Sequence, residues 1–198
     1  LFYDPVYYLS NPLEIIKVWE GGLASHGAAI GIPLSIYLLT KKQKDKTVLW
    51  ILDRVVIVVA LAAVLIRLGN LFNSEILGTA TDVPWAFIFA RVDEVPRHPA
   101  QLYEAIFYLI SFIILYFVYY KTDKKAKQGF IFGLFLVLIF GFRFFVEFLK
   151  IEQSAFEKGM ILDMGQLLSI PFIIGGLYFM FRKEKENINK KTKTKTAH

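Results

Sequence analysis

Long apolar runs alternate with polar segments along this chain. The runs lie at about residues 21–39, 48–66, 102–120, 130–149 and 160–181. Each has about the 20 residues that an α-helix needs to cross the hydrocarbon core of a bilayer. The pattern therefore predicts an all-α, polytopic membrane helical bundle with five spans. Residues 1–20 mix aromatic residues with prolines, which predicts an interfacial segment ahead of the first span.

Composition agrees with this class. Hydrophobic residues make up 56% of the 198 residues, against roughly 45–50% in soluble domains. The chain has no cysteine, so any thiol chemistry needs a thiol supplied by a substrate. A net charge of +6 would indicate a nucleic-acid partner in a soluble protein. Here the lysines fall between the apolar runs, so that their position explains them better and no nucleic-acid partner is expected.

The distribution of the basic residues predicts a topology. Segments 41–46 and 121–127 and the tail from Arg182 hold 4, 4 and 7 Lys and Arg residues, together 15 of the 23. Basic loops remain on the cytoplasmic side. We therefore expect the connecting segments at 1–20, 67–100 and 150–163 to be extracytoplasmic. This arrangement predicts one integral membrane domain over residues 1–181 and a basic, disordered cytoplasmic tail over residues 182–198.

A cluster of polar residues follows the second run. Arg67, Asn70, Asn73, Glu75 and Gly78 stand within one short segment. Ionisable groups at the mouth of a span mark a functional site by default, and glycine suits a loop that wraps a ligand. A lone arginine could instead extend to the headgroups, and Asn and Gly could form an ordinary turn. The whole cluster favours a site, within a loop region of more than thirty residues that runs on to Arg97.

Further polar side chains are expected at the same depth. Arg143 and Glu147 stand four residues apart in the fourth run, a spacing that predicts an intrahelical ion pair. Arg143 lies roughly 20 Å above the cytoplasmic end of that helix. Arginine binds phosphate through paired N–H groups. The residues thus predict a phospholipid-headgroup site on the extracytoplasmic side, with His26 available as a base or, in the alternative, as a structural hydrogen-bonding residue.

Ordered motifs carry a resemblance to a known family. They are Gly21-Gly22 with His26-Gly27, Arg67-x-Gly69-Asn70-x-x-Asn73-x-Glu75-x-x-Gly78, Pro84-Trp85, Arg97-His98-Pro99-x-Gln101-Leu102-Tyr103-Glu104, Arg143-x-x-x-Glu147-Phe148 and Met164-Gly165-Gln166. In this order they resemble the prolipoprotein diacylglyceryl transferase family. The blocks cover nearly the whole chain up to the tail.

The resemblance implies a reaction. A diacylglyceryl group would move from phosphatidylglycerol to the thiol of the lipobox cysteine of a prolipoprotein, releasing glycerol phosphate. It implies His26, Arg67 and Arg143 as catalytic residues, with the two arginines holding the lipid phosphate. The implied substrate-binding residues are Arg67, Asn70, Asn73, Glu75, Gly78, Tyr103, Arg143 and Glu147. No metal or organic cofactor is implied.

The implied chemistry suits these residue types. Sulfur attack at the glycerol carbon makes a phosphate ester the leaving group, and fixed guanidinium groups stabilise its developing charge. A thiol of pKa near ~8.5 needs partial deprotonation, which an imidazole of pKa near ~6.5 can assist. The resemblance also implies a multi-pass protein of the bacterial cytoplasmic (inner) membrane.

The chain departs from the family pattern in places. The family has seven spans, so the first two are expected to be absent, together with a tyrosine that they carry. Ala28, Ala100 and Ile139 stand where the family usually has Gly, Ser and Tyr. Two other interpretations remain open. One is a non-catalytic phospholipid-binding or lipid-translocating protein, and the other is a channel or carrier with charges along its pore.

Overall fold

The computed structural model describes residue 10 and residues 25–43, 46–151 and 162–183. The side chains of residues 25–30, 33, 125, 126 and 164 are outside this description. Contacts divide the chain into two units, Leu1–Val48 and Leu49–His198, and each is considered by itself. Most of the predicted interfacial segment at 1–20 and of the tail at 182–198 lies outside the described residues.

The first unit contains helix α2, Ser25–Lys42. This helix coincides with most of the first apolar run. Its last turn carries Lys41 and Lys42, whose charges stabilise the negative end of the helix dipole. The predicted catalytic residue His26 belongs to the first turn of α2, but its side chain is outside the described residues.

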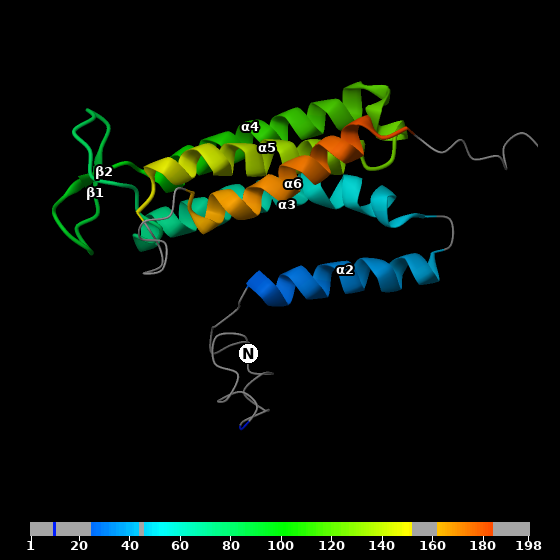
Figure 1. Cartoon of the computed structure of the whole chain (residues 1–198), viewed down its shortest axis with the longest axis horizontal. Coiled ribbons are helices and arrows are strands. Elements are labelled where there is room, and N and C mark those ends of the chain that lie inside the picture. The colour runs from blue at the N-terminus through cyan, green and yellow to red at the C-terminus, as the bar shows by residue number, and fades with distance from the viewer. Residues whose placement is uncertain (1–9, 11–24, 44–45, 152–161, 184–198) are drawn as a thin grey trace, which may run out of the picture. The chain divides into compact units, whose positions relative to one another are not determined.

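The second unit is a bundle of helices that lie side by side (Figure 1). They are α3 (Val48–Asn73), α4 (Ala100–Lys121), α5 (Phe130–Val146) and α6 (Met164–Phe181), with short 3-10 turns η3 (Asp123–Ala126) and η4 (Glu147–Leu149). In the described part of the chain, three helical stretches are long and apolar enough to cross a membrane: Val48–Asn73, Ala100–Lys121 and Phe130–Leu149. These confirm the membrane helical class and three of the predicted spans. Helix α6 is apolar but shorter.

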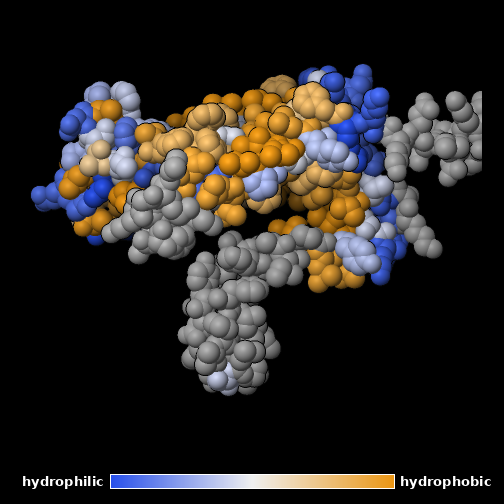
Figure 2. All heavy atoms as spheres, in the orientation of Figure 1, coloured by the Kyte–Doolittle hydropathy of each residue, from blue (hydrophilic) through white to orange (hydrophobic). Residues whose placement is uncertain are grey.

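The bundle is held by apolar packing and close backbone contact. Ala60, Leu115 and Ile131 are fully buried within its core. Gly133 of α5 faces Gly176 of α6 so closely that a Cβ on Gly133 would lie 2.6 Å from the Gly176 carbonyl oxygen. Small residues allow helices to approach closely in this way. Such packing matters in a membrane, because the hydrophobic effect does not drive helices together in lipid. Hydrophobic side chains cover the middle of this unit, and hydrophilic ones gather toward its two ends (Figure 2).

A buried carboxylate joins α3 to α5 at one end of the bundle. Asp53 is 1% exposed, and its two oxygens accept hydrogen bonds from the backbone N–H groups of Gly129 (2.6 Å) and Phe132 (2.8 Å). These N–H groups lie at the start of α5, where the helix has no internal acceptor for them. Asp53 therefore caps α5 from a neighbouring helix, which fixes the ends of two spans against each other.

The opposite end carries the connection between α3 and α4. It forms a small antiparallel hairpin of β1 (Phe87–Ile88) and β2 (Pro96–Arg97), with Phe87 opposite Arg97. A backbone bridge joins Gly78 to Lys150, and another joins Ala80 to Arg97. The long predicted loop region is therefore ordered and tied to the segment that follows α5.

Candidate active site

The polar cluster after the second apolar run begins within a helix. Helix α3 continues past the predicted end at residue 66 to Asn73, so the expectation of a loop from Arg67 onward is wrong for its first seven residues. Within this extension, Arg67 and Asn70 are three residues apart on one face and their side chains bond each other, Nη1 to Oδ1 at 3.3 Å. The turn comes later, at Ser74 and Ile76, which have φ of 58° and 56°.

This turn brings Glu75 back to the end of α3. The backbone N–H of Glu75 donates to the Asn70 carbonyl oxygen at 2.9 Å, and Asn70 Nδ2 donates to Glu75 Oε2 at 2.7 Å. Gln101 of α4 holds the other side of the turn, because its Nε2 donates to the Glu75 carbonyl oxygen at 2.5 Å. The result is a chain of hydrogen bonds from Arg67 through Asn70 to Glu75.

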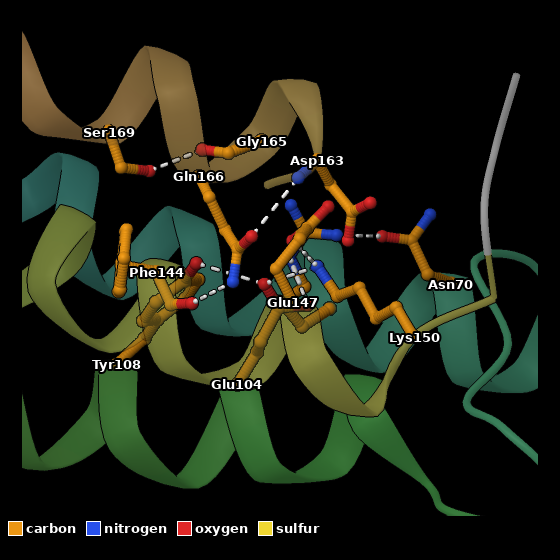
Figure 3. A network of polar contacts seen from close by, with 11 residues as sticks. Asn70, Glu104, Tyr108, Phe144, Glu147, Lys150, Asp163, Gly165, Gln166 and Ser169 are labelled. Carbon is orange, nitrogen blue, oxygen red and sulfur yellow. Dashed lines mark hydrogen bonds and ion pairs between the residues drawn. The ribbon is translucent and has the colours of Figure 1, made fainter. Parts of the chain in front are cut away.

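Glu104 of α4 is the centre of the site (Figure 3). It is completely buried, and its Oε2 lies 3.3 Å from Arg67 Nε while its Oε1 lies 3.0 Å from Lys150 Nζ. Tyr108, one turn further along α4, donates its hydroxyl hydrogen to the same Oε1 at 3.3 Å. A buried carboxylate needs such partners, since an unpaired one costs several kcal/mol of desolvation. Glu104 thus fixes the guanidinium of Arg67 against two other helical segments.

Lys150 also pairs with Glu147, at 3.0 Å from Nζ to Oε2. Both residues are nearly buried, at 7% exposure each. The predicted ion pair between Arg143 and Glu147 is wrong: among the described residues, Arg143 has no carboxylate within ion-pair distance. The physical reason is the change from α-helix to the 3-10 turn η4 at Glu147. Residues three apart eclipse in a 3-10 turn, so Glu147 faces Lys150.

Arg143 nevertheless belongs to the same part of the molecule as Arg67. It stands on α5 four residues before Glu147, and Glu147 shares Lys150 as a partner with Glu104. Arg143 is half-buried. The site therefore holds two arginines. Arg67 pairs with Glu104, whereas Arg143 forms no ion pair with any carboxylate among the described residues.

Helix α6 supports Glu147 from the other side (Figure 3). A Cβ on Gly165 would lie 2.5 Å from Glu147 Oε1, so any larger residue there would displace the carboxylate. Gln166 Nε2 donates to the Phe144 carbonyl oxygen at 3.1 Å, and Gln166 Oε1 accepts from the Asp163 N–H at 3.0 Å. The Met164-Gly165-Gln166 motif therefore has a structural role, because Gly165 and Gln166 form the surface of α6 against which the end of α5 packs.

Gly78 has a comparable role in the backbone. It pairs with Lys150, and a Cβ on Gly78 would collide with the carbonyl oxygen of His98. The neighbouring N–H of Thr79 donates to the Leu149 carbonyl oxygen at 2.8 Å. The loop after α3 therefore sets the backbone position of Lys150, whose ammonium group in turn pairs with Glu104 and Glu147.

Other predicted site residues lie at the rim or beyond. Tyr103 accepts a hydrogen bond from Trp85 Nε1 at 2.8 Å and lies 3.2 Å from His98 Nδ1, but it has no direct bond to Glu104. Asn73 is exposed at the last position of α3. His26 belongs to the other unit, so its position relative to the arginines stays a prediction.

Comparison with known proteins places the chain. A model of the prolipoprotein diacylglyceryl transferase family matches residues 1–182. This chain belongs to that family. It is 47% identical over 186 residues to a relative from Tolumonas auensis, covering 94% of this chain and 72% of that protein. It is 51% identical over 193 residues to one from Bacteroides fragilis, covering 91% and 69%. Both relatives bear the name phosphatidylglycerol–prolipoprotein diacylglyceryl transferase.

Three residues of the central network in this diacylglyceryl transferase chain were not predicted as site residues from the sequence: Glu104, Tyr108 and Lys150. In the sequence, Glu104 is the last residue of the Arg97–Glu104 motif, Tyr108 lies within an apolar run, and Lys150 begins the predicted connecting segment 150–163. Lys150 offered one signal, its spacing of three residues from Glu147 at the end of a helix. Tyr108 stands four residues after Glu104, which is the spacing of helical neighbours.

Proposed function

We propose that this protein transfers the diacylglyceryl group of phosphatidylglycerol to the thiol of the lipobox cysteine of prolipoproteins. The names of the relatives support this assignment. The geometry that carries it is the pairing of Arg67 with buried Glu104, beside an Arg143 that has no carboxylate partner among the described residues. Such a site has fixed positive charge to offer to a phosphodiester.

In the proposed reaction, the cysteine sulfur attacks the glycerol carbon that bears the phosphate. A carbon–sulfur bond forms and the carbon–oxygen bond to the phosphate breaks, so glycerol phosphate leaves with the bonding electron pair. The thiol proton passes to a base, for which His26 is the candidate. The diacylglyceryl thioether remains on the protein.

Lys150 has a distinct part in this proposal. Its ammonium group lies 3.0 Å from one oxygen of Glu104 and one of Glu147, so each of these carboxylates has a cationic partner. Without Lys150, Glu147 would be the nearest anionic partner of Arg143 along the helix. The lysine thereby keeps the Arg143 guanidinium available to the substrate phosphate, with its paired N–H groups unoccupied.

The same proposal includes an orientation in the bacterial cytoplasmic membrane. The end of the bundle with the β-hairpin, Arg67 and Glu104 would face the extracytoplasmic side, where prolipoprotein signal peptides arrive. The lysine-rich segments 41–46 and 121–127 and the tail at 182–198 would be cytoplasmic. Residues 1–181 would form the transferase domain, with Asn73 and Tyr103 near the substrates at its rim.

The proposal is tested by thioether formation on a lipobox peptide with the full-length protein in phosphatidylglycerol bilayers. Arg143→Lys keeps the charge but loses the planar pair of donors, so transfer should fall by at least about 10²-fold. His26→Ala should lower transfer by roughly 10²–10⁴-fold while phosphatidylglycerol still binds. Lys121→Gln, at the other end of α4, should leave transfer unchanged.

Near-normal transfer by Arg143→Lys would show that this arginine does not bind the lipid phosphate through paired N–H donors. Retained transfer by both His26→Ala and His26→Gln would remove the histidine from the mechanism. If the parent protein bound phosphatidylglycerol but formed no thioether, the non-catalytic lipid-binding interpretation would replace the transferase. Membrane levels of each variant, measured by immunoblot, separate loss of function from loss of protein.

A further inference from the structure

A groove of about 460 Å³ lies between α3 and α4, at the end of the bundle away from Glu104. Its walls include Val58, Leu61, Phe112 and Tyr116. Val58 is 68% exposed and Tyr116 is 44% exposed, so the groove opens outward from this unit. Of the lining residues, all of which the structure describes, Arg54 alone is charged. An apolar groove thus ends at a single cation.

The guanidinium of Arg54 is held by rings. Its central carbon lies 3.4 Å from the centre of the Trp50 ring and 5.4 Å from that of Tyr119. One N–H group, on Nη1, donates to the Trp50 carbonyl oxygen at 2.6 Å. Among the described residues no carboxylate lies within ion-pair distance of Arg54, because neighbouring Asp53 is occupied by the backbone of α5. Most of the five donors of the guanidinium are therefore available.

We propose that this groove binds an anionic phospholipid of the leaflet opposite the active site. The lipid phosphate would bond the guanidinium of Arg54, and an acyl chain would lie along Val58, Leu61 and Phe112. Arg54 is six residues from the start of α3, so it lies about 9 Å along the helix, near the depth of the headgroups and glycerol backbone. From there the groove runs toward the middle of the span, as a lipid tail does.

Charge around the groove favours an anionic lipid. The lysine-rich segments 41–46 and 121–127 adjoin the start of α3 and the end of α4, and basic residues of this kind concentrate anionic lipids near the surface. The site is distinct from that of the transfer reaction. Arg54 and Arg67 are 13 residues apart on one helix, which separates them by about 20 Å.

Fluorescence quenching by brominated lipids tests this proposal, with Trp50 as the local reporter. In the full-length protein, the other tryptophans are replaced by phenylalanine, and bilayers contain mixtures of phosphatidylcholine and phosphatidylglycerol with either lipid dibrominated. Brominated phosphatidylglycerol should quench Trp50 with an apparent affinity about fivefold above that of brominated phosphatidylcholine, since one basic residue contributes on that order. Arg54→Gln should bring the ratio close to one.

Two further variants make the test specific. Lys121→Gln removes an exposed cation from the same end of the bundle but not from the groove, so the ratio should stay near that of the parent. Val58→Phe narrows the groove without touching Arg54, and should weaken quenching by the brominated acyl chain. An equal affinity for both lipids in the parent, or an unchanged ratio in Arg54→Gln, would overturn the proposal. Absence of quenching by either lipid would mean that protein, and not lipid, covers the groove.

Discussion

Two arginines of helix α3 have contrasting surroundings. Arg67 is fixed by a buried carboxylate and an amide, at 3.3 Å from Glu104 Oε2 and 3.3 Å from Asn70 Oδ1. Arg54 is stacked on an indole ring and, within the described residues, has no carboxylate partner. The first belongs to a network that crosses from α3 through α4 to η4, whereas the second contacts aromatic groups near its own helix end. An ion-pair network of the first kind fixes the position of a guanidinium group. Aromatic stacking of the second kind leaves most of the N–H donors of the guanidinium available to a ligand.

The two ends of α3 also differ in how carboxylates are used. Glu104 pairs with cations from other segments, so its charge is matched by side chains. Asp53 bonds only backbone N–H groups among the described residues, so its charge is matched by the dipole at the start of α5. A change at the first end should therefore affect both chemistry and stability, and a change at the second should affect stability alone.

The largest effect is expected from Glu104→Gln. The amide removes the negative charge between Arg67 and Lys150, and breaking a buried ion pair from one side costs about 3–5 kcal/mol. Thermal unfolding in detergent should occur at a clearly lower temperature, and thioether formation should be nearly lost. Glu75→Gln is the matched control, because its carboxylate is exposed and its loss should cost less than about 1 kcal/mol. An unfolding temperature equal to the parent's in Glu104→Gln would show that Glu104 is not the centre of the network.

A smaller and purely structural effect is expected from Asp53→Ala. Removal of the carboxylate leaves two N–H groups at the start of α5 without their acceptor, and loss of a helix cap costs about 0.5–2 kcal/mol. Transfer per folded molecule should be retained, because Asp53 lies about 20 Å along α3 from Arg67. Asp123→Ala removes an exposed carboxylate from the same end and should change neither quantity. A loss of transfer in folded Asp53→Ala would show that the two ends are coupled.

The smallest effect is expected in the β-hairpin. Hydrogen bonds from Arg97 hold the pKa of Asp93 below its usual value. Because the folded pKa is lower than the unfolded one, the contribution to hairpin stability is present above about pH 4 and is lost as the pH falls through the folded pKa. Hydrogen exchange of the backbone amides of Phe87, Ile88 and Arg97 should be faster in Asp93→Asn than in the parent at pH 7. The difference should disappear in acid, and a difference that persists there would contradict this origin.

Much of the fold could be predicted from the sequence because it follows from the length of the apolar runs. Runs of about 20 apolar residues form the helices α3, α4 and α5, and lipid leaves few other structures open to such runs. The end of α3 could not be placed, since Arg67 and Asn70 are polar and look like the start of a loop. In the structure they are helical, and their side chains hydrogen-bond each other along one face of α3.

Part of the membership of the candidate site was predictable from the sequence, but its pairing was not. Arg67, Asn70, Glu75 and Glu147 do join one connected region, yet the partner of Glu147 is Lys150 and not Arg143. That choice depends on the local change to a 3-10 turn, for which the sequence offers no clear sign. Likewise, the partners of Asp53 lie 76 and 79 residues away, so only the packing of α3 on α5 reveals them.

The cap that Asp53 provides has a consequence for biogenesis. Gly129 follows Asp53 by 76 residues, so at about 5–20 residues per second its N–H group is synthesised roughly 4–15 s later. During that interval the Asp53 carboxylate cannot accept the two backbone hydrogen bonds that it accepts in the bundle. The surroundings of Asp53 in the bundle are therefore complete only after the start of α5 has been synthesised. The order of synthesis makes the start of α5, and not α3 alone, the segment that completes this cap.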